Sequence, residues 1–579
     1  MPSTATRPSP PRKRASLSLP RARAASAAAA AAVLLAGCGS SHGTGTSADP
    51  AGVVPASTPL YVGASVRPSG SLESAALAAG QALTRQPDPY ARLVGALQTP
   101  GSPTLVFKRD LAPWLGPQAA VFVSSLSSAA ALGPVLEQGL LSSSARGLSF
   151  PFATGAQGAI VLDTSDAAKA SSFLSGQAAR AGAQARTYRG VSYESTAGGV
   201  AFGMVDRFAV IGSESGLHSV IDTALGGQPL TAGASYSKLL AAAPAGALAH
   251  LYSAGAGAGA PAAQRGAGGL LSLVSGRDAA NVSLVPAASS LTIDADSVSG
   301  GSGAAGGGLL SSSSQGAGAL GELPGDSWLA VGLADAGQTL GGDVTGLQEL
   351  ASLGSSGPEA PSSGISVKGL LQGLLTPLGV LGADTAQAKH DYASWMGSAG
   401  VFASGSSLFE LKAAVVIGSH DPALSHAAVG KLAAQLQALG GTPQPVSIAG
   451  TDAAISVRLS GLPLALVIAD GRASNGQTKF VLGLGEASVG AALNPPSALS
   501  TSTSYAAAAS TLGEGIKPSI LVEFPVLLGI FEAVGLTESP PLSSFVPYLR
   551  NTTTLVGGGH ALSGEVQRLR LVLGLRQSG

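Results

Sequence analysis

A seven-residue motif occurs twice in this sequence, as DLAPWLG at residues 110–116 and as DYASWMG at residues 391–397. The segments that precede and follow each copy also match in order, so the sequence predicts one structural unit duplicated within a single chain. The two copies share Asp, Trp and Gly at the same places, namely Asp110, Trp114 and Gly116 in the first and Asp391, Trp395 and Gly397 in the second.

The secondary-structure pattern around the first motif predicts strands paired mainly as hairpins. Residues 60–66, 119–125 and 159–164 alternate or are β-branched, which is typical of strands. Ser165 or Asp166 is expected to cap a helix over residues 167–181. Two hairpins, helices and a closing hairpin follow up to residue 298. Because hairpins outnumber βαβ crossovers, we expect an α+β fold with mostly antiparallel sheets and flanking helices.

The second half repeats this order. Residues 328–335 match the first strand, and Asp421 is expected to cap a helix that begins at Pro422. In the hairpin and helix that follow, the alignment places Phe480 opposite Phe208 and Glu486 opposite Glu214. Residues 519–528 and 561–575 are predicted as strands. Whether the two halves share one sheet or form two lobes stays open.

At 579 residues, the chain is too long for one hydrophobic core. A tract rich in Gly, Ser and Ala separates the two matching halves. The predicted divisions are a signal peptide at 1–37, a disordered spacer at 38–52, a first α+β repeat at 53–298, a linker at 299–322 and a second α+β repeat at 323–579.

The N-terminus has the three parts of an export signal. Six basic residues and no acidic residue precede Cys38, and an apolar run covers residues 24–36. That run is shorter than the ~20 residues that a membrane-spanning helix needs. The sequence LAGC at its end resembles the lipobox of bacterial lipoproteins. The resemblance implies cleavage before Cys38, lipidation of its thiol, and recognition through Leu35, Ala36 and Gly37.

Two other interpretations of Cys38 stay open, an ordinary signal peptide with a lone cysteine and an uncleaved anchor. Cys38 is the only cysteine of the sequence. We therefore expect a protein on the extracytoplasmic side of the cell membrane, held there by the lipid on Cys38.

Charge argues against a nucleic-acid partner. The full chain has no net charge, and removal of the six N-terminal bases leaves an excess of six acidic residues. Binding of nucleic acid requires concentrated Lys and Arg to replace phosphate counterions.

Residues of the repeated motif are interpreted as structural. Asp110 can cap or turn the backbone, Trp114 can fill a core, and Gly116 permits a tight turn. The alternative is that Asp110 and Asp391 form a carboxylate pair across a cleft, as in glycosidases. We predict no catalytic residues, no metal site and no cofactor, because the histidines lack ligand spacing.

An ordered set of short motifs resembles a bacterial family known as a domain of unknown function (DUF3352). The family consists of envelope lipoproteins or membrane-anchored proteins with the same duplication, and it carries no established activity. The matching motifs are P-x-x-x-x-LYV, D-x-x-PWLG-x-x-AAVFV, AIVLDTSDAAKA, Y-x-G-V, VDRFAVIGSE and Y-x-x-LL.

Three functions are compatible with these features. The first is a non-catalytic binding or scaffolding lipoprotein of the cell envelope, with an unknown envelope protein or ligand as its partner. The second is an envelope hydrolase that uses carboxylates between the two halves. The third is a solute-binding lipoprotein, which would require doubly wound βαβ lobes.

Overall fold

The computed structural model describes residues 48–84, 105–125, 156–255, 279–298, 314–337, 377, 381, 386–407, 409–459, 464–533, 535–538, 542–563 and 565–577. The N-terminal signal region, with Leu35, Ala36, Gly37 and Cys38, lies outside these residues.

Twenty strands make up the described sheet. The first half contributes β1 (Leu60–Ser65), β2 (Leu115–Val123), β3 (Gly158–Thr164), β4 (Gln184–Tyr188), β5 (Val191–Ser195), β6 (Val200–Val205), β7 (Phe208–Ser213), β8 (Ala249–Ser253), β9 (Ala279–Pro286) and β10 (Ser290–Val298). The second half contributes β11 (Ser327–Leu333), β12 (Met396–Ser404), β13 (Lys412–Ser419), β14 (Thr442–Pro445), β15 (Thr451–Arg458), β16 (Leu466–Arg472), β17 (Thr478–Leu484), β18 (Ile520–Glu523), β19 (Thr552–Ala561) and β20 (Val566–Leu575).

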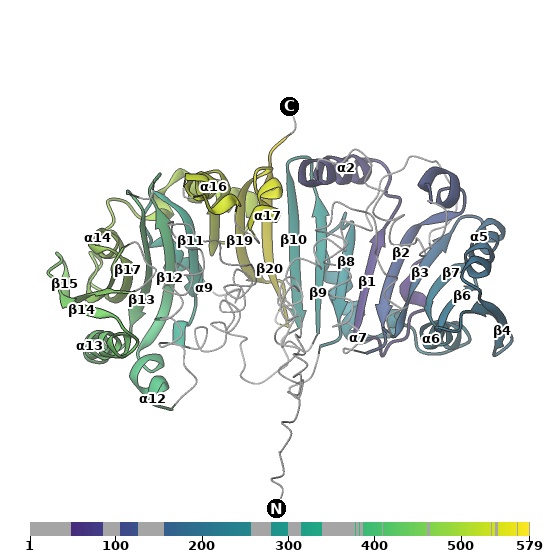
Figure 1. The fold of residues 1–579 in the computed structure, drawn as a ribbon, viewed down its shortest axis with the longest axis horizontal. Helices are drawn as coiled ribbons and strands as arrows, with labels where there is room; N and C mark the ends of the chain where they lie inside the picture. The colour runs from purple at the N-terminus through teal and green to yellow at the C-terminus, as the bar shows by residue number, and fades with distance from the viewer. Residues whose placement is uncertain are drawn as a thin grey trace, which may run out of the picture.

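The strands form one continuous antiparallel sheet across both halves (Figure 1). Their spatial order is β4-β5-β6-β7-β3-β2-β1-β8-β9-β10-β20-β19-β18-β11-β12-β13-β17-β16-β15-β14. The order of the second half mirrors that of the first about the β10–β20 pair. At a strand spacing of ~4.8 Å, the sheet is about 90 Å wide.

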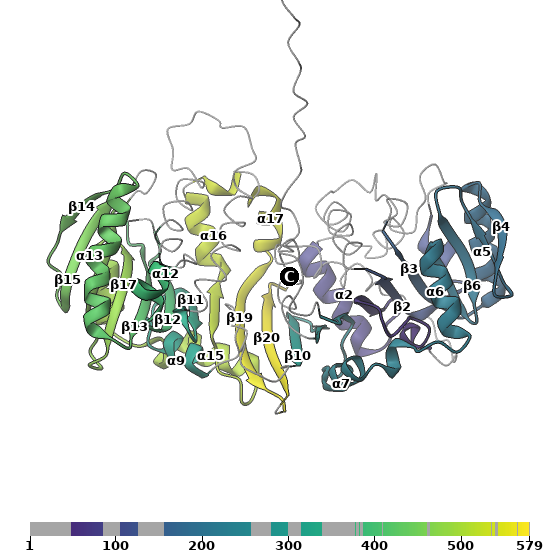
Figure 2. The same ribbon diagram turned by 90° about the horizontal axis from the view of Figure 1, so that it is seen from below.

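Helices cover both faces of this sheet (Figure 2). The helices are α2 (Ser71–Thr84), α5 (Ala167–Arg180), α6 (Glu214–Ala224), α7 (Ala234–Ala242), α9 (Ser314–Gly321), α12 (Ala386–Ala388), α13 (Pro422–Ala438), α14 (Glu486–Leu493), α15 (Thr503–Leu512), α16 (Phe524–Ala533) and α17 (Leu542–Leu549). Short turns of 3-10 or π helix are η1 (Pro50–Gly52), η2 (Phe107–Leu111), η4 (Leu230–Ala232), η6 (Lys389–Ala393), η7 (Leu499–Thr501) and η8 (Leu536–Glu538).

Each half has one core on each face of the sheet. On the face that we call face A, α5 and α13 pack over the two Trp residues of the repeated motif. On the opposite face, face B, the helices α6 and α7 cover the first half, and α9, α14 and α15 cover the second. Strand β3 is buried along its whole length because both of its faces are covered. The α+β class and the antiparallel pairing are therefore confirmed.

Local signals in the sequence account for the ends of several elements. The side chain of Asp166 accepts a hydrogen bond from the Lys169 N–H at the start of α5. Asp421 caps α13 in the same way, and Pro422 is its first residue. Arg189 and Asp206 adopt positive φ angles of 47° and 51° in the two hairpin turns. The two helix caps match the sequence predictions.

Three expectations about chain segments were wrong in part. The expected linker contains α9, whose Leu320 is fully buried against the second half. The expected spacer ends in η1, where Asp49 caps the turn and Ala51 packs in the face B core. The strand expected at 519–528 ends at Glu523, and α16 begins at the next residue. Small side chains allow the first two segments, which are rich in Gly, Ser or Ala, to pack closely, and composition alone does not reveal this.

Candidate functional site

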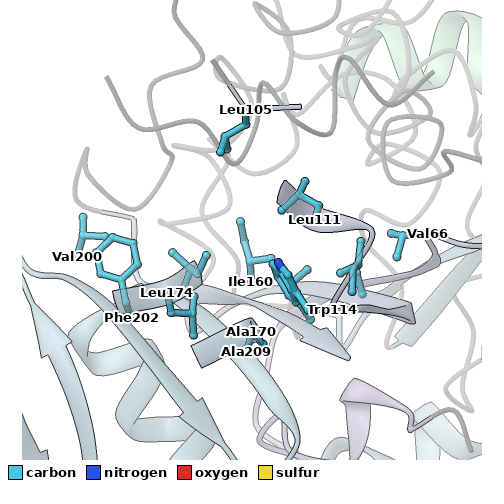
Figure 3. Packing of buried hydrophobic residues seen from close by; sticks show 14 of the residues in the cluster. Val66, Leu105, Leu111, Trp114, Ile160, Ala170, Leu174, Val200, Phe202 and Ala209 are labelled. Atoms are coloured by element: carbon cyan, nitrogen blue, oxygen red, sulfur yellow. The ribbon is translucent and has the colours of Figure 1, made fainter. Parts of the chain in front are cut away.

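The two copies of the repeated motif form the same structure. In each, a π-helical turn precedes a buried Trp whose indole N–H donates to the backbone oxygen of the motif's Asp, at 2.7 Å from Trp114 to Asp110 and 2.8 Å from Trp395 to Asp391. The backbone oxygen of each Trp then accepts a 2.8 Å hydrogen bond, from Ser165 in one half and from His420 in the other. Figure 3 shows Trp114 among the aliphatic residues of face A. Both tryptophans therefore fill cores, as the structural interpretation expects.

The glycines of the motif serve a different purpose from the one expected. Gly116 and Gly397 lie inside β2 and β12, and neither has a positive φ. A Cβ atom on Gly116 would lie 2.4 Å from the buried carboxylate of Asp163, and one on Gly397 would lie 2.9 Å from the His420 ring. Glycine is required at position 116, because both the side chain and the backbone of Asp163 come close, whereas the ring beside Gly397 belongs to the exposed His420 and can move aside. The tight turn predicted at Gly116 was wrong.

Asp110 and Asp391 have different partners. Asp110 accepts a 2.7 Å hydrogen bond from the Val106 N–H and pairs with Arg109, which lowers the pKa of its carboxyl. Asp391 accepts 2.7 and 2.6 Å hydrogen bonds from Gln387 and Lys431. These hydrogen bonds hold the pKa of the Asp391 carboxyl well below its ordinary value. Both groups are ionised acceptors: Asp110 stabilises its own loop, and Asp391 also joins its loop to α13 through Lys431.

The structure does not bring the two carboxylates together. Asp110 precedes β2 and Asp391 precedes β12, and nine strand-to-strand steps separate these strands. At ~4.8 Å per step, this is about 40 Å along the sheet. Glycosidase carboxylates lie only about 5–9.5 Å apart. The carboxylate pair was therefore wrong for these two residues.

The aromatic partner of the Trp differs between the halves. The ring centroid of Trp114 lies 5.1 Å from that of Phe173 in α5, whereas the ring centroid of Trp395 lies 5.1 Å from that of Phe480 in β17. The strand pairings place Phe480 at the position of Ala209, one residue away from the alignment with Phe208. Phe208 packs on face B instead. Where the first half has Phe173 and Ala209, the second thus has Ala428 and Phe480, so one large and one small side chain fill the same space.

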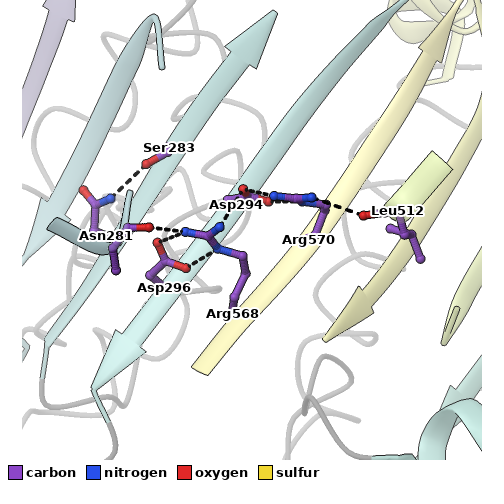
Figure 4. A network of polar contacts seen from close by, with 8 residues as sticks. Asn281, Ser283, Asp294, Asp296, Leu512, Arg568 and Arg570 are labelled. Carbon is purple, nitrogen blue, oxygen red and sulfur yellow. Dashed lines mark hydrogen bonds and ion pairs between the residues drawn. The ribbon is translucent and has the colours of Figure 1, made fainter. Parts of the chain in front are cut away.

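A cluster of four charges, three of them buried, joins the halves at the centre of the sheet. Asp294 and Asp296 of β10 lie opposite Arg570 and Arg568 of β20. Both carboxylates have no exposed surface, and Arg568 is 6% exposed. Arg568 donates to Asp296 at 2.7 and 2.8 Å, and Arg570 donates to Asp294 at two distances of 2.8 Å (Figure 4). We call these four residues the central pin.

The central pin also closes two helix ends. Arg568 donates at 2.6 Å to the backbone oxygen of Ala242, the last residue of α7. Arg570 donates at 3.1 Å to that of Leu512, the last residue of α15. Cations stabilise helix C-termini, where unpaired carbonyls carry partial negative charge. Burial raises the pKa of the Asp296 carboxyl above its ordinary value. The two hydrogen bonds from Arg568 act in the opposite direction but do not outweigh the effect of burial.

Asp294 and Arg570 occupy equivalent positions as well as opposite ones. Ile160 in β3 and Val415 in β13 are equivalent residues of the two halves, and following directly opposite residues from strand to strand leads from them to Ala295 and Leu571. These two residues come one position after Asp294 and Arg570. The first series is Ile160, Val121, Val62, Leu251, Val282, Ala295, and the second is Val415, Val401, Val331, Ile520, Gly557, Leu571. The approximate twofold axis that relates the two halves therefore passes between Asp294 and Arg570.

The central pin was not among the residues predicted from the sequence. Its signal is an alternation of charged and aliphatic residues inside two strands, DAD at 294–296 and RLR at 568–570. Alternate residues of a strand share a face, so each pair of like charges lies on one side of the sheet. Opposite charge at that spacing in two strands indicates pairing between them.

A second polar cluster lies where α6 covers the end of the sheet, at β4 and β5. Tyr193 donates to Glu214 at 2.5 Å and lies 2.9 Å from the ring of His218. His218 stacks on Tyr188 with 3.8 Å between ring centroids. Burial and the hydrogen bond to Glu214 raise the pKa of Tyr193 to about 12, so the phenol keeps its proton at neutral pH. The cluster is a hydrogen-bonded brace, and it holds β4 in place.

No group of three or more His, Cys, Asp or Glu side chains within the described ranges has the geometry to hold a metal ion. Among the helices that the structure describes, none has the length and apolarity required to span a bilayer.

Comparison with known proteins gives a family but no activity. Residues 22–516 match a family described as "Protein of unknown function (DUF3352)". A search among curated proteins found no match. A solved structure described as "Structure of crystal form I of TP0453" is similar with a TM-score of 0.25 and 10% identity, over 45% of this chain and 81% of that chain. No conclusion about this chain rests on so low a score.

Proposed function

Because this chain belongs to the DUF3352 family of proteins of unknown function, we propose its role from its own residues. It is a lipoprotein anchored through Cys38 on the extracytoplasmic side of the cell membrane, where it acts as a non-catalytic binding or scaffolding protein. The observation that carries the scaffolding role is the single sheet, whose ends lie about 90 Å apart along its width.

We infer that the two halves arose by duplication of one unit. The mirrored strand order, the two equivalent Trp loops and the axis between Asp294 and Arg570 support this origin. In a symmetric pair of identical chains, the residue on the axis would face its own copy, which places like charges opposite each other. After fusion, the two copies can carry different residues at this position, so Asp294 can lie opposite Arg570 and the contact becomes attractive. This advantage favours two copies joined in one chain over a pair of identical chains.

The anchor rests on the sequence LAGC at 35–38 and on the lack of any other cysteine. One acyl chain binds a membrane only marginally, whereas two or more hold firmly. The diacylglyceryl group that the lipobox implies would therefore tether the whole sheet near the bilayer.

We expect radiolabelled palmitate to enter the wild-type protein and not the Cys38→Ala variant. The thioether at Cys38 is the only attachment point that the lipobox resemblance provides. The measurement is the label in the protein band recovered from membranes, normalised to protein amount. Equal label in the variant would contradict the anchor and leave the scaffolding role without its tether.

The two alternatives have less support. A hydrolase that uses Asp110 with Asp391 would require carboxylates far closer than the sheet places them. A solute-binding lipoprotein would require doubly wound lobes with parallel strands, whereas the described strands pair only in antiparallel fashion.

Crosslinking in intact cells tests the scaffolding role. We expect the wild-type protein, tagged near its C-terminus, to recover a constant set of envelope proteins, and Cys38→Ser to lose that set because it leaves the membrane. The double variant Asp110→Asn/Asp391→Asn serves as the matched comparison and should keep the set. Loss of a membrane-associated hydrolytic activity in this double variant, with folding intact by circular dichroism, would favour the hydrolase instead.

A further inference from the structure

The sheet ends in two strands that have different edges. Among the described residues, β4 pairs only with β5, and β14 pairs only with β15. A free strand edge offers unpaired N–H and C=O groups to another strand, and proteins commonly block such edges. The two ends of this sheet occupy equivalent places in the two halves, so their differences can be compared directly.

The β14 edge is blocked by proline. The backbone N–H of Val446 donates to the backbone oxygen of Ala454 in β15. Alternate residues of a strand direct their backbone groups to the same side, so the backbone groups of Gln444 and Thr442 also point toward β15. Pro443 and Pro445 therefore face outward. Proline has no N–H to offer, and on edge strands it prevents further pairing.

The β4 edge is open. A two-residue turn at Arg189 and Gly190 joins β4 to β5, with Tyr188 opposite Val191. In such hairpins, the residues that flank the turn bond to each other, so Tyr188 faces inward. Ala185 and Thr187 then present their N–H and C=O groups outward, and both residues are exposed. Ala185 takes the register position that Pro445 has on β14.

Side chains hold β4 ready for pairing. Tyr188 stacks on His218 and donates to Asp222 at 3.2 Å. Arg189 also donates to Asp222, at 2.7 Å, and Arg186 lies 3.8 Å from Glu214. An ordered edge loses less conformational entropy when a strand is added. Arg186 of β4 and Arg189 of the turn each lie beside an acid of the same chain, which reduces the repulsion that Arg186 would meet from its own copy across a twofold contact.

From these observations we propose that two copies of this protein pair through β4, in antiparallel fashion, to form a closed twofold dimer. The chain blocks with proline the one edge that would let copies add end to end, and leaves β4 unblocked, which favours a second copy as the occupant. Because β14 cannot accept β4, association through β4 ends at two copies. Joining one end to the other would build open filaments, whereas joining like ends closes after one contact. Antiparallel addition of β4 to β4 is strand addition at a sheet edge. The proposal goes beyond the anchored scaffolding role and does not depend on it.

Cysteine crosslinking of the full-length protein in membranes tests the contact. Ala185→Cys/Thr187→Cys covers every register that bonds the outward groups. An internal disulfide between residues two apart in one strand would leave the protein a monomer, so non-reducing gel electrophoresis distinguishes it from a linked dimer. We expect mild oxidation to give a disulfide-linked dimer. The matched control is Thr442→Cys/Gln444→Cys on β14, which should stay monomeric. Wild-type protein reports any background from Cys38. Equal yields from the two edges would overturn the proposal.

Proline substitution provides the second measurement, by sedimentation velocity of the full-length protein in detergent. Wild type should show a dimer, and Ala185→Pro should weaken it at least about tenfold because outward hydrogen bonds are lost. Conversely, Pro443→Ala/Pro445→Thr opens the second edge and should give assemblies larger than a dimer. An unchanged dimer in a folded Ala185→Pro variant, or a wild-type protein that is monomeric throughout, would refute the β4 contact.

Discussion

Arg568→Ala should lower the free energy of unfolding by about 3–5 kcal/mol, the usual result of removing one member of a buried ion pair. Arg568 makes two hydrogen bonds to Asp296, which has no exposed surface. The variant would leave that carboxylate buried and unpaired, and it would also free the backbone oxygen of Ala242. Denaturation in urea, followed by circular dichroism, measures the loss.

Two further variants separate the central pin from charge effects in general. Arg550 pairs with Glu532 on the surface, with 56% and 44% of their side chains exposed. Arg550→Ala should cost less than about 1 kcal/mol. The double variant Asp296→Leu/Arg568→Met should recover much of the stability, since apolar replacements of buried pairs are often tolerated. If Arg568→Ala cost no more than Arg550→Ala, the pin would have no structural role.

Trp114→Ala and Trp395→Ala should each lower the free energy of unfolding by about 3–5 kcal/mol, because a large buried ring is replaced by a cavity. Trp114 is 2% exposed and Trp395 is fully buried, and each also loses an indole hydrogen bond. Thermal and urea unfolding measure both variants. Similar losses at the two sites would show that the two loops are equivalent in energy as well as in geometry.

Phe173 and Phe480, which contact the two tryptophans from different elements, provide the control for this prediction. Phe173→Ala alone should cost about 1–3 kcal/mol, less than the loss of a fully buried ring, because Phe173 is only partly buried. Adding Ala209→Phe places the ring where the second half has Phe480, and should restore most of that loss. An unchanged melting temperature in Trp114→Ala would identify the ring as a surface contact. Failure of Ala209→Phe to compensate would mean that the two halves fill this space independently.

Much of the fold follows from local patterns in the sequence. The apolar run in residues 159–162 and the acids at Asp166 and Asp421 predict a strand and two helix starts that the structure has. The order of the strands does not follow from such patterns. Pairing of β10 with β20 joins residues that are 268 to 284 positions apart, and no short-range signal reports on it. The packing of α9 also depends on partners elsewhere in the chain.

The candidate sites show a similar division. A buried role for Trp114 could be predicted because aromatic residues at strand ends commonly fill cores. The role of Gly116 could not, because the carboxylate of Asp163 that approaches it comes from another strand. The alignment of Phe208 with Phe480 was wrong by one residue because sequence similarity of a ring outweighed the strand register. In the structure, the register decides which face a side chain occupies.

The central claim is that two matching halves form one sheet through β10 and β20. Hydrogen exchange of the backbone amides tests it most directly, because buried strands exchange only through large unfolding events. We expect the amides of β10 and β20 to exchange as slowly as those of β3 and β13, in the last event to open. Exchange of β10 and β20 as fast as that of the end strands β4 and β14, while β3 and β13 stay protected, would show two independent lobes and contradict the claim.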